Sequence, residues 1–215
     1  MYNKIKRIFD IIVSLTGIIL TSPLWFIAII GIEISDPGPI FYKANRVGKD
    51  NKVFKMYKFR SMTVDKNADE KSFKADTSRI FKFGAFMRSS KIDELPQLIN
   101  VYEGTMSLVG PRPAAKDQVD ITRGGKYKIA STVKPGLTGP AALYDYIYGD
   151  SVEDPDDYER LVLPTRLELE AYYPAHMNAF YDLKIIFYTV ICILCSLMGK
   201  FPARIYNELV RCVND

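Results

Sequence analysis

The sequence predicts an α+β fold that is mostly helical, with a small β element and with membrane-associated helices at both ends of the chain. Three observations lead to this prediction. Residues 8–32 form a long apolar run with one charged residue, Asp10. Residues 40–62 carry apolar and aromatic residues on both sides of a Gly-Lys-Asp-Asn turn, which is typical of two short strands. The remaining chain shows helical patterns separated by loops rich in Pro and Gly.

The composition excludes several classes of protein. The chain has 215 residues, of which 48% are hydrophobic and 25% are charged, and its mean hydropathy is −0.03. A disordered chain would hold less apolar material, and a polytopic membrane protein would be far more hydrophobic. With three cysteines and one histidine, a disulfide framework, a histidine-based metal site and a Ser-His-Asp triad are all disfavoured. Cys192 and Cys195 lie inside an apolar run, so we predict that they serve packing.

The apolar run 8–32 is long enough for a membrane helix. At about 1.5 Å per residue it measures roughly 37 Å, more than the hydrocarbon core of about 30 Å. The residues before it include Lys4, Lys6 and Arg7 and no acid, which favours a cytoplasmic N-terminus. We therefore assign residues 1–34 to a membrane segment.

Ser22-Pro23 interrupts this segment near its midpoint. A kinked helix that spans the membrane is one interpretation, because serine can satisfy a carbonyl that proline leaves free. A re-entrant hairpin is the other, and the charges favour it. Seven lysines and arginines follow within 43–60, so both flanks are basic, whereas a spanning helix should leave one flank poor in Lys and Arg.

Residues 35–182 are predicted to form a cytoplasmic catalytic domain. Its expected strands lie on either side of the Gly-Lys-Asp-Asn turn, and its expected loops are 109–113, 134–140 and 148–157, where the acidic stretch 153–157 is read as solvated. Helices are expected at 64–72, 93–103 with a stop at Gly104, 114–121, and 157–173 with a break at Pro164.

Residues 183–215 are assigned to helices at the membrane interface. The run 183–199 is apolar apart from Lys184, which is marginal for a span, and a buried or interfacial helix fits at least as well. Residues 201–215 alternate apolar and charged side chains at helical spacing, as a helix lying on a surface would.

Two adjacent carboxylates, Asp93 and Glu94, precede Leu95-Pro96. Because proline is tolerated only in the first turn of a helix, these acids are expected at or just before a helix N-terminus. Helix capping is the simplest role for such a pair. In the functional interpretation, one carboxylate is a nucleophile and the other binds a hard cation such as Mg2+.

Basic residues near this pair favour phosphate chemistry. Arg88 and Lys91 lie just upstream, and Arg112 lies between two prolines. A fixed arginine beside the backbone amides of Val109 and Gly110 is a suitable phosphate clamp, although a solvated surface arginine is the alternative.

The basic stretch 43–60 is adjacent to the membrane segment, which favours an anionic lipid surface as its partner. We do not expect nucleic acid as a partner, because the net charge is only +4 and no binding motif accompanies the stretch. Lys58 and Arg60 share one face of a strand, which also allows a pair of phosphate-binding cations.

Taken together, these segments resemble the bacterial monotopic phosphoglycosyl transferases, known as the bacterial sugar transferase family. The resemblance covers nearly the whole chain, in the short form of the family without the additional N-terminal membrane domain of longer members. The matching segments are KRIFDIIVSLTGIILTSPL, GPIFYKANRVGKDNKVFKMYKFRSM, KIDELPQLINVYEGTMSLVGPRP, VKPGLTGPA and FYDLKIIFYTV.

The resemblance implies a reaction in two steps. The aspartate that matches Asp93 attacks the β-phosphorus of a UDP-sugar, releases UMP and becomes a phosphosugar ester. A polyprenol phosphate such as undecaprenyl phosphate then attacks this ester and leaves as a polyprenol diphosphate sugar. This reaction is the first membrane step in the assembly of surface glycoconjugates.

The resemblance also assigns roles to individual residues. It implies that Glu94 holds Mg2+ and that Arg112 binds a phosphate, with further basic positions matched by Lys58, Arg60 and Arg88. It implies a re-entrant helix broken at Ser22-Pro23. After KPGLTG the chain reads PAALYDYIYGD, where many members have a WAQ-type continuation, so the sugar is left unassigned.

The implied location is the bacterial inner membrane, with a monotopic chain whose catalytic domain lies on the cytoplasmic face. The implied partners are a UDP-sugar, a polyprenol phosphate and membrane lipids, and a homo-oligomer is left open. Two alternatives remain: a non-catalytic membrane-surface adaptor in which the carboxylate pair only caps a helix, and a protein with one spanning helix and an external domain.

Overall fold

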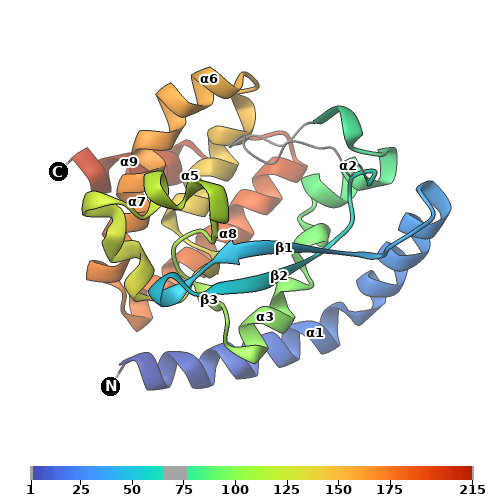
Figure 1. The fold of residues 1–215 in the computed structure, drawn as a ribbon, viewed down its shortest axis with the longest axis horizontal. Coiled ribbons are helices and arrows are strands. Elements are labelled where there is room, and N and C mark those ends of the chain that lie inside the picture. The colour runs from blue at the N-terminus through green and yellow to red at the C-terminus, as the bar shows by residue number, and fades with distance from the viewer. Residues whose placement is uncertain (1, 65–76, 215) are drawn as a thin grey trace.

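The computed structural model, which describes residues 2–64 and 77–214, has an α+β fold dominated by helices (Figure 1). The expected helix at 64–72 lies almost entirely outside the described residues. The helices are α1 (Tyr2–Ser35), α2 (Lys82–Ser89), α3 (Gln97–Glu103), α4 (Val119–Thr122), α5 (Pro140–Ile147), α6 (Pro155–Asp157), α7 (Leu163–His176), α8 (Ala179–Leu197) and α9 (Ala203–Asn214). The strands are β1 (Phe41–Val47), β2 (Val53–Phe59), β3 (Ser107–Val109), β4 (Ala114–Ala115) and β5 (Gly136–Thr138).

Helix α1 is continuous and contains Pro23. The structure has no interruption of the helix at Ser22-Pro23, and Figure 1 shows α1 bending partway along its length. Pro23 has no N–H to donate to the carbonyl of Ile19, four residues earlier. The Ser22 hydroxyl donates to this carbonyl at 2.8 Å, so the acceptor is satisfied and the helix continues. Re-entry of this helix into one face of a membrane stays a prediction.

Polar contacts hold the N-terminal part of α1 on the rest of the fold. Arg7 donates from its two terminal nitrogens to the carbonyls of Val101 and Tyr102, each at 2.6 Å, at the end of α3. Asp10, the one charge of the apolar run, is 2% exposed. It accepts hydrogen bonds from the Ser107 hydroxyl at 2.8 Å and from the Leu108 amide at 3.0 Å in β3. The charge therefore fastens α1 to the body.

The C-terminal part of α1 is held by apolar packing. Ala28 and Ile32 are fully buried against Phe59 of β2 and Met87 of α2. This small cluster is separate from the main core, which lies among α3, α5, α7, α8 and α9. The two ends of α1 thus contact the body in different ways.

Strands β1 and β2 form the expected antiparallel hairpin, with Phe41 opposite Phe59 and Val47 opposite Val53. In the turn, Asp50 and Asn51 adopt positive φ angles of 54° and 56°, a conformation that Asp and Asn tolerate better than most residues. The hairpin prediction is confirmed.

Two of the loops contain short strands. β3 and β5 pair in parallel, which joins the segment before Arg112 to the predicted loop 134–140. β4 pairs with the end of β1, so the three-stranded sheet has the order β2-β1-β4. The helix expected at 114–121 is therefore wrong at its start, because Ala114 and Ala115 complete this sheet edge and α4 begins only at Val119.

The chain remains helical from Pro155 to His176. α6 leads into a π-helical segment, Tyr158–Val162, and this continues directly as α7. The expected break at Pro164 does not occur. Pro164 lies in the first turn of α7, directly after the π-helical segment, so the helix changes its hydrogen-bond pattern where proline has no N–H to donate. Asp154 caps α6 by accepting from the amides of Asp156 and Asp157.

Helices α8 and α9 complete the fold. Both contribute to the main core, through Ile185 and Cys192 of α8 and through Ile205 and Leu209 of α9. The packing role predicted for Cys192 is confirmed, since it is 2% exposed and is a free thiol. The apolar face of α9 is covered by α5 and α7. Ile205 and Leu209 thus pack against the rest of the fold, and contact of residues 201–215 with a membrane stays a prediction.

Two helices are long and apolar enough to cross a membrane by length and composition. The apolar window of α1 has a mean hydropathy of 2.1 and that of α8 has 1.8, and little of either window is buried. Apolar residues exposed along α1 are Ile5, Ile8, Phe9, Ile12, Leu15, Ile19, Leu20, Leu24, Phe26, Ile27, Ile30 and Ile34. Those exposed along α8 are Phe180, Leu183, Phe187, Val190, Leu194 and Leu197.

Candidate active site

The two adjacent carboxylates lie in a single 3-10 turn, Ile92–Glu94, directly before α3. Lys91 precedes the turn with a left-handed backbone conformation, φ 57°, and its carbonyl accepts from the amide of Glu94 at 3.2 Å. The prediction that these acids come just before a helix N-terminus is confirmed, because α3 begins at Gln97.

Asp93 is buried, and one of its oxygens has no partner. Only 3% of the Asp93 surface is exposed to solvent. Among the described residues, none donates a hydrogen bond to Oδ1 of Asp93. Burial raises the pKa of Asp93, although the charges of Lys58, Lys91 and Arg88 oppose the increase. A buried carboxylate oxygen without a donor is costly to maintain, so it points to a role beyond capping.

Glu94 has the opposite electrostatic environment. Its Oε1 accepts from the ammonium group of Lys58 at 2.9 Å. Burial acts to raise the pKa of Glu94, but the charges of Lys58 and Lys91, the hydrogen bond from Lys58 and the charge of Arg112 outweigh it and lower the pKa to about 2. Two neighbouring carboxylates thus have pKa values displaced in opposite directions, which is common where residues have different chemical tasks.

Arg112 lies near the pair and is itself held by a buried acid. Its Nη1 contacts Oδ2 of Asp145 in α5 at 2.8 Å. About half of the Arg112 side chain is exposed, while the Asp145 side chain is 8% exposed. The Asp145 carboxylate raises the pKa of Arg112, which is therefore a permanent cation. Its outer face is free to meet an anion.

Asp145 belongs to a buried series of polar contacts. The hydroxyl of Tyr158 donates to Oδ1 of Asp145 at 2.5 Å, and Arg166 donates to that hydroxyl at 2.7 Å. Burial acts to raise the pKa of Asp145, but the charges of Arg112 and Arg166 and the hydrogen bond from Tyr158 together lower it. The acid that holds Arg112 therefore stays ionised.

The series continues to the backbone of Arg112 and so closes on itself. Nε of Arg166 lies 3.5 Å from Oε1 of Glu170, and Arg123 donates to the other oxygen of Glu170 at 2.5 Å. Arg123 also donates to the main-chain carbonyl of Arg112 at 2.5 Å. We call this set the buried ring: Arg112, Asp145, Tyr158, Arg166, Glu170 and Arg123.

The Pro-Arg-Pro loop is also fixed through its backbone. The Gly110 amide donates to the Thr138 carbonyl at 2.9 Å, and the Gly136 amide donates to the Pro111 carbonyl at 2.8 Å. A Cβ atom at Gly136 would lie 2.1 Å from the nitrogen of Gly110, so this close approach requires glycine. The expectation that the Gly110 amide binds phosphate is wrong, because that amide is used within the fold.

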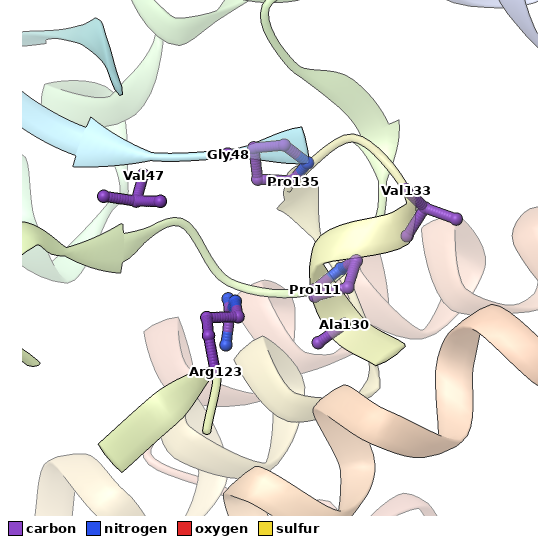
Figure 2. Close-up of a pocket in the computed structure, with 7 residues that line it drawn as sticks. All are labelled: Val47, Gly48, Pro111, Arg123, Ala130, Val133 and Pro135. Carbon is purple, nitrogen blue, oxygen red and sulfur yellow. The ribbon is translucent and has the colours of Figure 1, made fainter. Parts of the chain in front are cut away.

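A narrow crevice lies behind this loop (Figure 2). In Figure 2, Arg123 points toward the segment that carries Pro111. The crevice has no room for a water molecule, so it is a gap in the support of the loop and not a substrate site. Its lining residues are Val47, Gly48, Pro111, Arg123, Ala130, Val133 and Pro135.

The two remaining predicted cations, Arg88 and Arg60, have different surroundings. Arg88 lies near enough to lower the pKa of Asp93 by its charge, and its Nη1 contacts the sulfur of Met62 at 3.8 Å. Arg60, by contrast, is 5% exposed. It pairs with Asp36 and donates to the Pro39 carbonyl at 2.6 Å. The structure therefore gives Arg60 the task of holding the turn after α1, and the expected phosphate-binding pair of Lys58 and Arg60 is not formed.

The oxygen ligands of the pair suit a hard cation. Within residues 2–64 and 77–214, no group of three or more His, Cys, Asp or Glu side chains could hold a metal. Mg2+ usually takes only one or two carboxylates from a protein and completes its shell with water and substrate phosphates. Glu94, whose carboxylate is held ionised, fits the role of the single protein carboxylate in such a shell.

Sequence reasoning identified Asp93, Glu94 and Arg112 but missed most of the buried ring. Its members come from segments that are distant in sequence, so no local spacing reveals them. One signal was present. Arg166 and Glu170 are four residues apart on the inner face of α7, and charges at helical spacing on a buried face indicate a polar network.

Comparison with known proteins identifies the family of the chain. A family profile described as "Bacterial sugar transferase" matches residues 1–196. The chain is 39% identical to the UDP-glucose:undecaprenyl-phosphate glucose-1-phosphate transferase of Klebsiella pneumoniae over 86% of this chain and 39% of that protein. It is 36% identical to the UDP-N-acetylgalactosamine-undecaprenyl-phosphate N-acetylgalactosaminephosphotransferase of Aeromonas hydrophila over 90% of this chain and 44% of that protein.

A shorter relative is covered almost completely. The chain is 35% identical to the exopolysaccharide production protein PSS of Rhizobium leguminosarum bv. phaseoli over 87% of this chain and 94% of that protein. The chain thus spans less than half the length of the first two relatives and nearly all of the third. Because the profile covers residues 1–196, including the segments that carry Asp93, Glu94 and Arg112, the chain belongs to the bacterial sugar transferase family.

Proposed function

We propose that this chain transfers a phosphosugar from a UDP-sugar to a polyprenol phosphate such as undecaprenyl phosphate, with release of UMP. The observation that carries the proposal is the buried, unpartnered Oδ1 of Asp93 beside a cluster of cations. A carboxylate held in this way is a suitable nucleophile toward phosphorus. The names of the relatives from Klebsiella pneumoniae and Aeromonas hydrophila support these two classes of substrate.

In the first proposed step, a carboxylate oxygen of Asp93 forms a bond to the β-phosphorus of the UDP-sugar. The bond from that phosphorus to the bridging oxygen breaks, UMP leaves with the electron pair, and Asp93 carries the phosphosugar as a mixed anhydride. Arg112 and Lys58 neutralise the anionic oxygens that would otherwise repel the carboxylate, and the raised pKa of Asp93 reflects a nucleophile that little water solvates.

In the second proposed step, an oxygen of the lipid phosphate attacks the same phosphorus, and the bond to Asp93 breaks. The products are a polyprenol diphosphate sugar and the free Asp93 carboxylate. One site thus serves a water-soluble donor and a lipid acceptor in turn, which is a ping-pong scheme. Mg2+, held by Glu94, would offset phosphate charge when bound.

We propose that the chain lies at the cytoplasmic face of the bacterial inner membrane. Support comes from the exposed apolar faces of α1 and α8 and from Lys4, Lys6 and Arg7 before the apolar run. A lipid phosphate is confined to a membrane surface, so its enzyme must be there too. The product class places the reaction at the start of surface glycoconjugate assembly.

The test is a panel of UDP-sugars presented to the full chain in lipid nanodiscs with undecaprenyl phosphate and Mg2+. We expect UMP from at least one member of the panel, and we expect a chelator to stop its release. Release of UDP in place of UMP would contradict the proposal. No nucleotide product from any donor would favour the membrane-surface adaptor, in which the carboxylates only cap α3.

A further inference from the structure

A cavity of about 310 Å³ lies between α5 and the turn that joins α8 to α9. This volume is at the lower end of the range of small-ligand pockets. Its walls include Tyr146 and Ile147 of α5, Cys192 and Ser196 of α8, and Lys200 and Phe201 of the turn. The family segments and the reaction steps above give this cavity no role.

One wall of the cavity touches the turn that carries the carboxylates. The ammonium group of Lys91 lies 4.3 Å from the centre of the Tyr146 ring, a cation–π contact. Lys91 immediately precedes the turn, and its charge lowers the pKa of both Asp93 and Glu94. The Lys91 ammonium group also lies 3.8 Å from Oδ2 of the exposed Asp150. The Tyr146 wall of the cavity therefore contacts a lysine that lies two residues before Asp93.

The other end of the cavity is continuous with an apolar surface. Leu194, Leu197 and Met198 at the end of α8 are 53%, 60% and 60% exposed, and Phe201 in the cavity wall is 58% exposed. Lys200 lines the cavity as well and, within the part of the chain that the structure describes, makes no ion pair. Exposed apolar side chains thus extend from the end of α8 to the cavity, whose Tyr146 wall contacts Lys91.

We propose that this cavity binds the phosphate end of the polyprenol phosphate acceptor. The isoprene units next to the phosphate lie against Ile147, Cys192 and Phe201, and the phosphate lies toward Lys91. A lipid phosphate needs an apolar surface for its chain and cations for its headgroup. The cavity has an apolar wall that continues onto an apolar surface, and Lys91 and Lys200 are the cations near it. A nucleotide would gain nothing from that continuity. This assignment rests on the proposed transferase function.

The test fills the cavity and measures the two steps separately. Ser196→Phe adds a ring to the cavity wall, and Ile121→Phe adds a ring at an exposed position on α4, outside the cavity wall and outside α8. We expect Ser196→Phe to raise the KM for undecaprenyl phosphate about tenfold, since it removes ground-state binding. The stoichiometric UMP release from UDP-sugar alone should be unchanged, and Ile121→Phe should resemble the unmodified chain.

Other outcomes would overturn the assignment. An unchanged lipid KM in Ser196→Phe would show that the acceptor binds elsewhere. A loss of donor-only UMP release in Ser196→Phe, with a raised KM for the UDP-sugar, would mean that the cavity holds the nucleotide. If the unmodified chain releases no UMP at all, the proposed function fails, and the cavity assignment fails with it.

A second measurement avoids a bulky substitution. Ser196→Cys is close in size, and it can be made in a chain whose Cys195 and Cys212 are replaced by alanine while the buried Cys192 is kept. We expect undecaprenyl phosphate to slow the labelling of this thiol by a maleimide, and neither UDP-sugar nor inorganic phosphate to do so. Equal labelling rates with and without the lipid phosphate would contradict the proposal.

Discussion

The carboxylate turn and the Pro-Arg-Pro loop meet at one site, but they are held in opposite ways. In the turn, Asp93 is buried with an oxygen that no described residue satisfies. In the loop, Arg112 is fixed by Asp145 through its side chain and by Arg123 through its carbonyl. The carboxylate proposed to react has an oxygen that accepts no hydrogen bond from a described residue, while the guanidinium group proposed to bind phosphate is held in place.

This difference has a physical reason. A nucleophile that is already well hydrogen-bonded must lose those bonds before it can attack, so solvation slows it. A cation that stabilises developing charge is most effective when it needs no reorganisation during the reaction. Burying the unsatisfied Asp93 oxygen lowers the stability of the folded chain. Packing elsewhere offsets this loss, including the separate apolar cluster under the C-terminal part of α1.

The largest effect should come from the reacting group. Asp93→Asn keeps the size of the side chain and removes its charge, so we expect UMP release to fall on the order of 10³-fold or more. Circular dichroism should show a folded protein. Retained activity in this variant would contradict the role of Asp93 as nucleophile. The carboxylate turn and the Pro-Arg-Pro loop would then not differ as a reacting group and a binding group.

The next effect should come from the fixed cation. Arg112→Lys keeps the positive charge but loses the planar group that can face Asp145 and a phosphate at once. We expect kcat to fall on the order of 10²-fold, as measured by steady-state UMP release. A matched control is Arg160→Lys, whose exposed pair with Asp157 lies on the surface. Equal behaviour of the two variants would argue against a special role for Arg112.

The support of the loop can be tested through one hydroxyl. Tyr158→Phe removes the hydroxyl that bridges Asp145 and Arg166. Because two buried charges then lose a hydrogen-bond partner, we expect the free energy of unfolding to fall by about 1–3 kcal/mol. Tyr127→Phe removes a hydrogen bond to Glu168 at a more exposed position, and we expect a change within about 0.5 kcal/mol. Urea unfolding measures both, and similar losses would refute the buried ring.

The smallest effects should appear in the pH dependence of stability. The folded pKa of Glu94 is lowered to about 2 from 4.5. Its ionised form therefore stabilises the fold above pH 4.5, and this contribution is lost as the pH falls from 4.5 toward 2. The folded pKa of Asp93 is raised, so its ionised form destabilises the fold near neutral pH, and this cost disappears below its ordinary pKa.

Two variants distinguish the destabilising effect of ionised Asp93 from the stabilising effect of ionised Glu94. At pH 7, we expect Asp93→Asn to raise the melting temperature and Glu94→Gln to lower it. At pH 3 both differences should shrink, because Asp93 is then protonated in the folded chain and part of the Glu94 contribution is lost. Thermal melts at the two pH values measure this, and the same sign for both variants at pH 7 would contradict the opposite environments.

Much of the fold followed from sequence patterns that act locally. The hairpin with its Gly-Lys-Asp-Asn turn, the stop of α3 at Gly104 and the apolar helices are local features, and the structure confirms them. The two differences have different causes. Ser22 donates to the Ile19 carbonyl that Pro23 leaves free, which is a local contact. Ala114 and Ala115 pair with β1, a strand far away in sequence.

The site, too, contains residues that the sequence reveals and residues that only the structure reveals. The carboxylate pair and Arg112 stand in recognisable segments, so the sequence reveals them. Arg60 stands in such a segment too, but only its burial against Asp36 and Pro39 shows that it serves structure. The partners of Arg112 are spread over α5, α7 and the segment before Gly124. Nothing in their sequence spacing indicates that they meet.

The central claim is that Asp93 reacts before the lipid does, and single-turnover chemistry tests it most directly. The full chain is mixed with an accepted UDP-sugar and Mg2+ but no polyprenol phosphate, and quenched samples are analysed for UMP and by peptide mass spectrometry. We expect a burst of about one UMP per active site, with a phosphosugar mass added to the peptide that contains Asp93. Absence of UMP and of the adduct until lipid phosphate is supplied would contradict it.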